Sequence, residues 1–153
     1  MKTILAPVDF SAASEAVLTQ AIDLARALAG RVVLLTVIQP PVITSEYAAL
    51  MENLAEVMAA GERNAARRLR ELEARVRAAQ LPVETLQLTG APVRQILEQA
   101  ERLSADFIVM GSHGHTALYD LLVGSTTHGV LLRAPCALVI TPGPKAAKTA
   151  RAA

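Results

Sequence analysis

Residues 31–38 read RVVLLTVI, and this stretch decides the fold class. A strand with one buried face alternates apolar and polar residues, whereas a strand covered on both faces is an almost continuous apolar run. The run is rich in β-branched residues and is closed by Pro40 and Pro41. It therefore predicts a strand of a parallel sheet that helices cover on both sides.

The sequence before this strand predicts one more strand and one helix. Residues 3–8 form a short apolar run that ends at Asp9, and Ser11 supplies a side-chain oxygen able to cap the next helix. The helix is expected over about residues 12–28, and Gly30 is expected to end it. Its apolar face comprises Val17, Ala21, Leu24, Ala25 and Leu28.

A long helical pattern follows over about residues 47–79, where apolar residues recur at spacings of three, four or seven. Gly61 is the expected point of a kink or a division. The opposite face carries many arginines, with Glu71 and Arg75 as a supporting pair one turn apart. This basic face is interpreted as solvated rather than as a binding patch.

The rest of the chain repeats the same alternation. Strands are predicted over residues 81–89, 106–110 and 136–141, one helix opens at Gly90 and Pro92, and another covers about residues 125–133. Five alternations predict an α/β fold, an open doubly wound five-stranded parallel sheet with helices on both faces. The strand order we expect for such a Rossmann-like sheet is 3-2-1-4-5. We expect one domain over residues 1–142 and a flexible tail over 143–153.

Composition narrows the function classes. Hydrophobic residues make up 52% and charged residues 19% of the 153 residues, which is typical of a globular chain. The net charge of +1 and the absence of Trp argue against nucleic acid or an anionic membrane as a partner. Cys136 lies among small apolar residues, so we expect a buried thiol in a reducing, cytoplasmic setting.

The candidate binding site follows from the fold. In an open parallel sheet, ligands bind beyond the carboxyl ends of the strands, where the strand order reverses. This rule selects residues 7–11, 37–41 and 111–124, and the last of these opens the run GSHGHTALYDLLVGSTTHGV. Gly111 and Gly114 let the backbone approach an anion, while Ser125, Thr126 and Thr127 open a helix whose N–H groups and hydroxyls can donate. The pattern predicts a phosphate cradle.

Two other interpretations of this run remain open. The run matches neither a Walker A loop nor the GxGxxG pattern, and the glycines could simply end a strand, make a turn and stop a helical turn. His113, His115 and His128 could converge on a metal ion, although no carboxylate or thiol accompanies them at a ligand spacing. We favour His113 beside a phosphate and assign no role to His115 and His128.

These residues resemble the universal stress protein family. Its ATP-binding members carry Gly, two residues, Gly, nine residues and then Gly followed by Ser or Thr, which Gly111, Gly114, Gly124 and Ser125 match. Further similar segments are ILAPVDFS, LLTVI, GAPVRQILEQA, DFIVMGSHG and APCALVI, so that the resemblance covers about residues 2–141. One departure is Thr126-Thr127-His128, where relatives often have Val, Thr and Glu.

The resemblance implies a ligand, its contact residues and a partner. The ligand would be ATP, with Mg²⁺ or Mn²⁺ accompanying the phosphates. Asp9 would meet the adenine, beside Pro7, Val8 and Val37. Residues expected along the ribose and phosphates are Met110, Gly111, His113, Gly114, Gly124, Ser125, Thr126 and Thr127. It also implies a homodimer through the last strand, Ala137 to Thr141, and covering such an apolar edge makes physical sense.

Three functions stay open on the sequence. The favoured one is an ATP-binding stress-response module in which the nucleotide biases dimer conformation or partner binding. The second is a slow ATPase or nucleotidyl-transfer enzyme, which the lack of an evident general base and of a Walker lysine disfavours. The third is a nucleotide-free dimeric interaction protein that uses the fold only as a scaffold.

Overall fold

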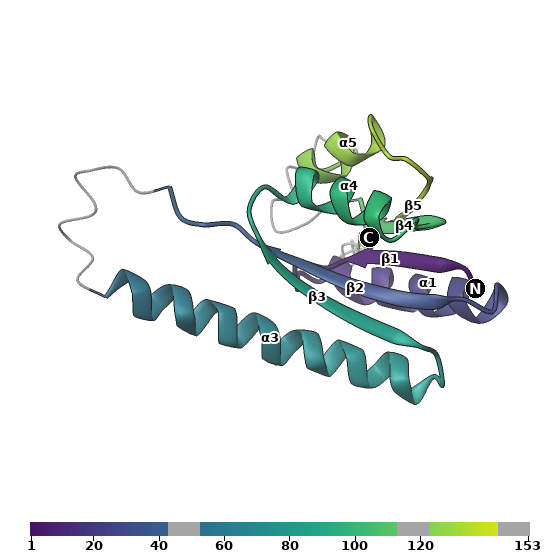
Figure 1. The fold of residues 1–153 in the computed structure, drawn as a ribbon, viewed down its shortest axis with the longest axis horizontal. Helices are drawn as coiled ribbons and strands as arrows, with labels where there is room; N and C mark the ends of the chain where they lie inside the picture. The colour runs from purple at the N-terminus through teal and green to yellow at the C-terminus, as the bar shows by residue number, and fades with distance from the viewer. Residues whose placement is uncertain (43–52, 113–122, 144–153) are drawn as a thin grey trace, which may run out of the picture.

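The computed structural model describes residues 1–42, 53–112 and 123–143, and it shows one parallel five-stranded sheet (Figure 1). The strand order is β3-β2-β1-β4-β5, as the sequence predicts. The elements along the chain are β1 (Thr3–Pro7), α1 (Ala13–Ala27), β2 (Arg31–Ile38), α3 (Leu54–Ala78), β3 (Val83–Thr89), α4 (Pro92–Arg102), β4 (Phe107–Gly111), α5 (Ser125–Leu131) and β5 (Ala137–Thr141).

Each face of the sheet has its own apolar core, because successive side chains of a strand point to opposite faces. On one face Ile4 and Ala6 of β1 pack with α1 and α3. On the other face Leu5 packs with Ile96 of α4 and Val130 of α5. Residues 32–35 of β2 are fully buried, which confirms the two-sided cover that the run RVVLLTVI predicts.

Helix α3 is longer than the face that it covers. Its buried residues, Ala65, Leu69, Leu72 and Val76, all lie from the middle of the helix onward, and its first turns extend past the sheet (Figure 1). The helix does not divide at Gly61, where an added Cβ would meet nothing within 4 Å. Residues 47–52 of the predicted helix lie outside the described residues. None of the helices in the described ranges is both long and apolar enough to cross a membrane.

Charged groups fix the amino-terminal ends of β1 and β4 to each other. Asp106 accepts hydrogen bonds from the Lys2 ammonium at 2.7 Å and from the Thr3 backbone N–H at 2.8 Å. These two donors, with the Lys2 bond as the larger cause, hold the pKa of the Asp106 carboxyl below its ordinary value. The Asp106 carboxylate therefore holds β4 beside β1 at the amino-terminal ends of the two strands. Farther along, the parallel pairing of Ile4 with Phe107 fixes their register.

Contrary to the prediction from the sequence, Gly30, in the turn between α1 and β2, is not the residue whose conformation ends α1. Ala29, with φ 49°, takes the left-handed conformation that ends the helix, and the Gly30 N–H bonds the Ala25 carbonyl at 2.8 Å. Glycine is needed at position 30 for space instead. A Cβ there would lie 2.6 Å from the Lys2 carbonyl oxygen and 2.8 Å from Ile4 Cδ1.

Two substitutions in this turn should therefore change stability in opposite directions. Ala29→Gly should raise the free energy of unfolding by about 0.5–1 kcal/mol, because glycine removes the steric cost of the left-handed conformation. Gly30→Ala should lower it by about 1–3 kcal/mol, because the β1 backbone must move to admit the methyl group. Urea denaturation of both variants measures the two effects, and equal destabilisation by both would contradict this assignment.

Candidate functional site

The strand order reverses between β1 and β4, and several predicted site residues within the described ranges lie near the carboxyl ends of β1, β2 and β4. Pro7 is the last residue of β1, and the Val8 N–H continues the pairing by donating to the Leu35 carbonyl at 2.8 Å. Met110 and Gly111 end β4. Val37 lies two positions beyond Leu35, the β2 partner of Pro7. The structure thus brings the ends of β1, β2 and β4 to one edge.

Asp9 follows β1 and is exposed, and its carboxylate is oriented from within its own loop. Its Oδ1 accepts a hydrogen bond from the Ser11 N–H at 2.9 Å and one from the Ser14 hydroxyl at 3.3 Å. The prediction that Ser11 caps α1 is wrong. Ala12 occupies the N-cap position, no side chain makes a capping bond there, and the Ser11 Oγ is buried. The Ser11 backbone N–H donates to Asp9, while the Ser11 Oγ has no hydrogen-bond partner among the described residues.

Ser112, directly after β4, joins three segments at this edge. Its carbonyl accepts from the Gly124 N–H at 2.6 Å, and its N–H donates to the Thr141 carbonyl at 2.8 Å. Its hydroxyl oxygen accepts from the Gly143 N–H at 3.1 Å. The start of α5 is consequently held against the ends of β4 and β5, although residues 113–122 between them lie outside the described residues.

The three hydroxyl residues that open α5 differ in their exposure to solvent and in their hydrogen bonds. Ser125 is exposed and Thr126 half-buried, whereas Thr127 is 5% exposed and its hydroxyl donates to the Gly111 carbonyl at 2.8 Å. The Thr127 hydroxyl proton therefore closes α5 onto β4. Gly124 precedes the helix with φ −64° and ψ 156°, a conformation open to any residue, so glycine there gives access rather than backbone freedom.

Some predicted residues cannot be placed. His113, His115 and Gly114 lie outside the described residues, and His128 is exposed on α5. Within the described ranges no three His, Cys, Asp or Glu side chains form a group that could hold a metal ion. Burial raises the pKa of the half-buried Cys136 thiol, which disfavours the nucleophilic thiolate there.

Sequence reasoning missed three residues at this edge. Ser14 orients Asp9, Ser112 joins β4 to α5, and Arg68 reaches the loop after β1 from α3. Ser14 carries a usable signal, because a serine five positions after Asp9 at the start of a helix can turn back to the carboxylate. Arg68 carries none, since α3 contains several arginines and the spacing of this one does not distinguish it from the others.

The fold and this edge define a class, a doubly wound parallel α/β protein with its candidate site at the β1–β4 reversal. Residues 1–142 match the universal stress protein family, and the chain belongs to that family. Universal stress protein MJ0531 of Methanocaldococcus jannaschii is 40% identical over 63 residues. That match covers 41% of this chain and only 37% of the relative's length.

Solved structures share the fold over most of the chain. MJ0577 of the same organism, a universal stress protein, superposes with a TM-score of 0.81 at 27% identity, covering 95% of this chain and 98% of the other. Two more distant universal stress proteins were solved with nucleotides. One is in complex with cAMP; it superposes with a TM-score of 0.69 at 24% identity, covering 92% of this chain and 96% of the other. The second, from Archaeoglobus fulgidus, is in complex with dAMP; it superposes with a TM-score of 0.64 at 20% identity, with the same two coverages. At these identities they show the fold alone for this chain.

The Thr127 hydroxyl should be a structural bond of this edge. Thr127→Val keeps the shape of the side chain but leaves the Gly111 carbonyl without this donor, and should lower the free energy of unfolding by about 1–2 kcal/mol. Thr127→Ser retains the hydroxyl and serves as the control. Thermal denaturation should rank the proteins in the order wild type, Ser and Val. A valine variant as stable as wild type would show that the bond contributes nothing.

Proposed function

We propose that the chain is an ATP-binding universal stress protein, a cytoplasmic nucleotide-sensing regulatory module rather than a dedicated enzyme. The observation that carries this proposal is the spacing of Gly111, Gly114, Gly124 and Ser125, the described members of which meet at the carboxyl edge of β4. Ser112 holds Gly124 at this edge through the 2.6 Å bond to its N–H. The cAMP and dAMP complexes of distant relatives support an adenine nucleotide as the ligand class.

The adenine is proposed to lie at the end formed by Pro7, Val8, Asp9 and Val37. Adenine presents an exocyclic amino group that donates, whereas guanine presents a carbonyl that accepts at the same place. The Asp9 carboxylate, already oriented by Ser11 and Ser14, can accept from the amino group and would repel the carbonyl. This end should therefore select adenine over guanine.

The ribose and phosphates are proposed to lie along Met110, Gly111, His113, Gly114, Gly124, Ser125, Thr126 and Thr127. The first N–H groups of a helix have no partner within it, so those of α5 can donate to phosphate oxygens. The hydroxyls of Ser125 and Thr126 can add to them, whereas Thr127 would contribute its backbone. Mg²⁺ or Mn²⁺ would be held by the phosphates themselves.

Ligand binding should appear as thermal stabilisation. At an ATP concentration about 100-fold above Kd, the free energy of unfolding should rise by about 2.7 kcal/mol, equivalent to roughly 5–10 °C in Tm. GTP at the same concentration should give a much smaller shift. Mass analysis of the supernatant after denaturing the purified protein should identify a co-purifying adenine nucleotide. If ATP, ADP and AMP at millimolar concentrations leave Tm unchanged, the proposal fails.

A matched pair of glycine variants serves as the control for this measurement. Gly124→Val should abolish the ATP-dependent shift, because φ −64° admits valine while the side chain enters the space proposed for the phosphates. Gly61→Ala, on the exposed part of α3 with open space around it, should leave the shift intact. An unchanged shift in the valine variant would place the phosphates elsewhere.

The homodimer is proposed to form through the edge strand β5. This strand pairs with β4 on one side and is an end strand of the described sheet. Ile140 in β5 is 37% exposed, and Leu132 at the end of α5 is 70% exposed. An unpaired apolar edge favours pairing with another chain, and a second copy of β5 would satisfy its backbone groups.

Ile140→Lys should convert such a dimer into a monomer, because a charge on the edge strand must be desolvated in the paired state. Sedimentation equilibrium should give about twice the chain mass for wild type and the single-chain mass for the variant. Val57→Lys, which places the same charge at an exposed apolar residue of α3, should not change the assembly. A monomeric wild type contradicts the dimer, and a dimeric Ile140→Lys variant contradicts this interface.

A further inference from the structure

Phe10, the residue after Asp9, has a backbone conformation that aromatic residues rarely adopt. Its φ is 62°, in the left-handed region, where the Cβ of a bulky residue is crowded. Such a conformation persists only where the surrounding structure supports it. The loop that carries Asp9 therefore needs an outside support, and the residues packed against Phe10 show where it comes from.

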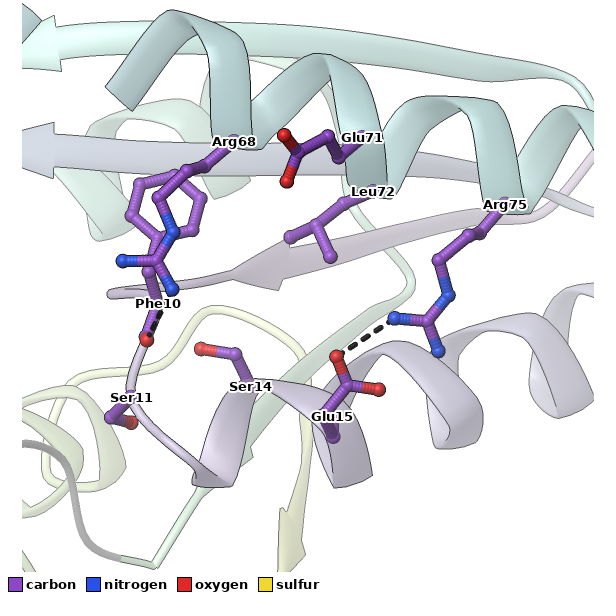
Figure 2. A pocket seen from close by; sticks show the side chains of 8 residues that line it. All are labelled: Phe10, Ser11, Ser14, Glu15, Arg68, Glu71, Leu72 and Arg75. Atoms are coloured by element: carbon purple, nitrogen blue, oxygen red, sulfur yellow. Dashed lines mark hydrogen bonds and ion pairs between the residues drawn. The ribbon is translucent and has the colours of Figure 1, made fainter. Parts of the chain in front are cut away.

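Arg68 of α3 supplies that support through two contacts with Phe10 (Figure 2). Its guanidinium carbon lies 4.7 Å from the centre of the Phe10 ring, within the range of a cation–π interaction. Its Nη2 donates a part-buried hydrogen bond to the Phe10 carbonyl oxygen at 3.0 Å. One side chain thus holds both the ring and the backbone of the residue with the unusual φ.

The bond from Arg68 reaches Asp9 through a single peptide group. The Phe10 carbonyl and the Ser11 N–H belong to the same planar unit, so fixing one end fixes the direction of the other. Arg68 donates to the carbonyl, and the N–H of the same unit donates to Asp9 Oδ1 at 2.9 Å. A cation on the carbonyl also polarises the peptide group and strengthens the donation by its N–H.

A second arginine of α3 makes a comparable bridge without this link. Arg75 donates to the Glu15 carboxylate of α1 at 2.8 Å, and the bond lowers the pKa of Glu15 (Figure 2). Arg75 and Arg68 line the same hollow of about 210 Å³ between α1 and α3. Arg75 thus joins the two helices as Arg68 joins α3 to the loop, but its hydrogen bond goes to Glu15 and not to the peptide group that holds Asp9.

We propose that Arg68 is a positioning residue for the nucleotide site, which orients the Asp9 carboxylate through the Phe10–Ser11 peptide group. The inference rests on the proposed function and adds a residue 58 positions away from the loop that it supports. It gives α3 a role in base recognition, since the carboxylate that would meet the adenine amino group depends on a side chain of this helix.

The test compares Arg68→Gln, Arg68→Lys and the control Arg75→Gln in isothermal titration with Mg-ATP. Arg68→Gln should raise Kd about tenfold, since it removes a charge-assisted hydrogen bond and the cation over the ring. Arg68→Lys should recover part of this loss, because lysine keeps the charge but not the planar fork. Arg75→Gln should leave Kd within about twofold of wild type, although it also removes a link between α3 and the rest of the chain.

A measurement without ligand separates this inference from the proposed function. Amide hydrogen exchange of ligand-free protein should be faster at Ser11 in Arg68→Gln than in wild type and unchanged at Ser11 in Arg75→Gln. A wild type that binds no nucleotide overturns the proposed function and, with it, the role of Arg68 in binding. A wild type that binds while Arg68→Gln binds as tightly as Arg75→Gln overturns the positioning role alone. If Arg68→Gln does not fold, Arg68→Lys decides, and an unchanged Kd and Ser11 exchange overturn the proposal.

Discussion

The parallel pairing of β1 with a strand on each side is the constraint on which the rest of the structure depends. β1 pairs with β2 on one side and with β4 on the other. The helix after β1, α1, packs on one face of the sheet, and the helix after β4, α5, packs on the opposite face. The segments that follow β1 and β4 therefore depart to opposite faces from adjacent strand ends. Loops that diverge in this way leave the strand ends between them accessible, which is why ligands of this fold class lie there.

The two sides of this edge are held by different means. At the β4 end the support comes from the backbone and hydroxyls of neighbouring elements, with Ser112 and Thr127 joining α5 to the strand ends. At the β1 end a charged side chain from α3 reaches a loop distant in sequence. Backbone bonds between packed elements persist as long as the elements do, whereas a half-buried guanidinium can be exchanged for water at modest cost. The adenine end of the proposed site should consequently be the more adjustable of the two.

The fold was predictable from the sequence because long-range order here follows from local pattern. A continuous apolar run such as RVVLLTVI permits little besides a strand covered on both faces, and five alternations with helices leave few topologies. The predictions for Gly30 and Ser11 were wrong because they depended on contacts in three dimensions. Gly30 is required because a Cβ there would meet the carbonyl of Lys2, just before β1. Ser11 precedes the N-cap position, which Ala12 occupies, and the Ser11 Oγ makes no capping bond. The residue pattern along the chain shows neither arrangement.

The same distinction applies to the candidate site and bears on what the site can do. Glycine spacing and strand ends identified the edge, but Arg68 could not be separated from the other arginines of α3 without the positive φ of Phe10. Of the residues in the proposed site, Asp9 is the only carboxylate, and the hydrogen bonds from Ser11 and Ser14 would orient it toward the proposed adenine. A general base for phosphoryl transfer must lie within hydrogen-bond reach of the attacking group, at the other end of the nucleotide. A carboxylate that recognised adenine would therefore favour holding the proposed nucleotide over hydrolysing it, and Arg68 would couple its binding to α3 through the Asp9 loop.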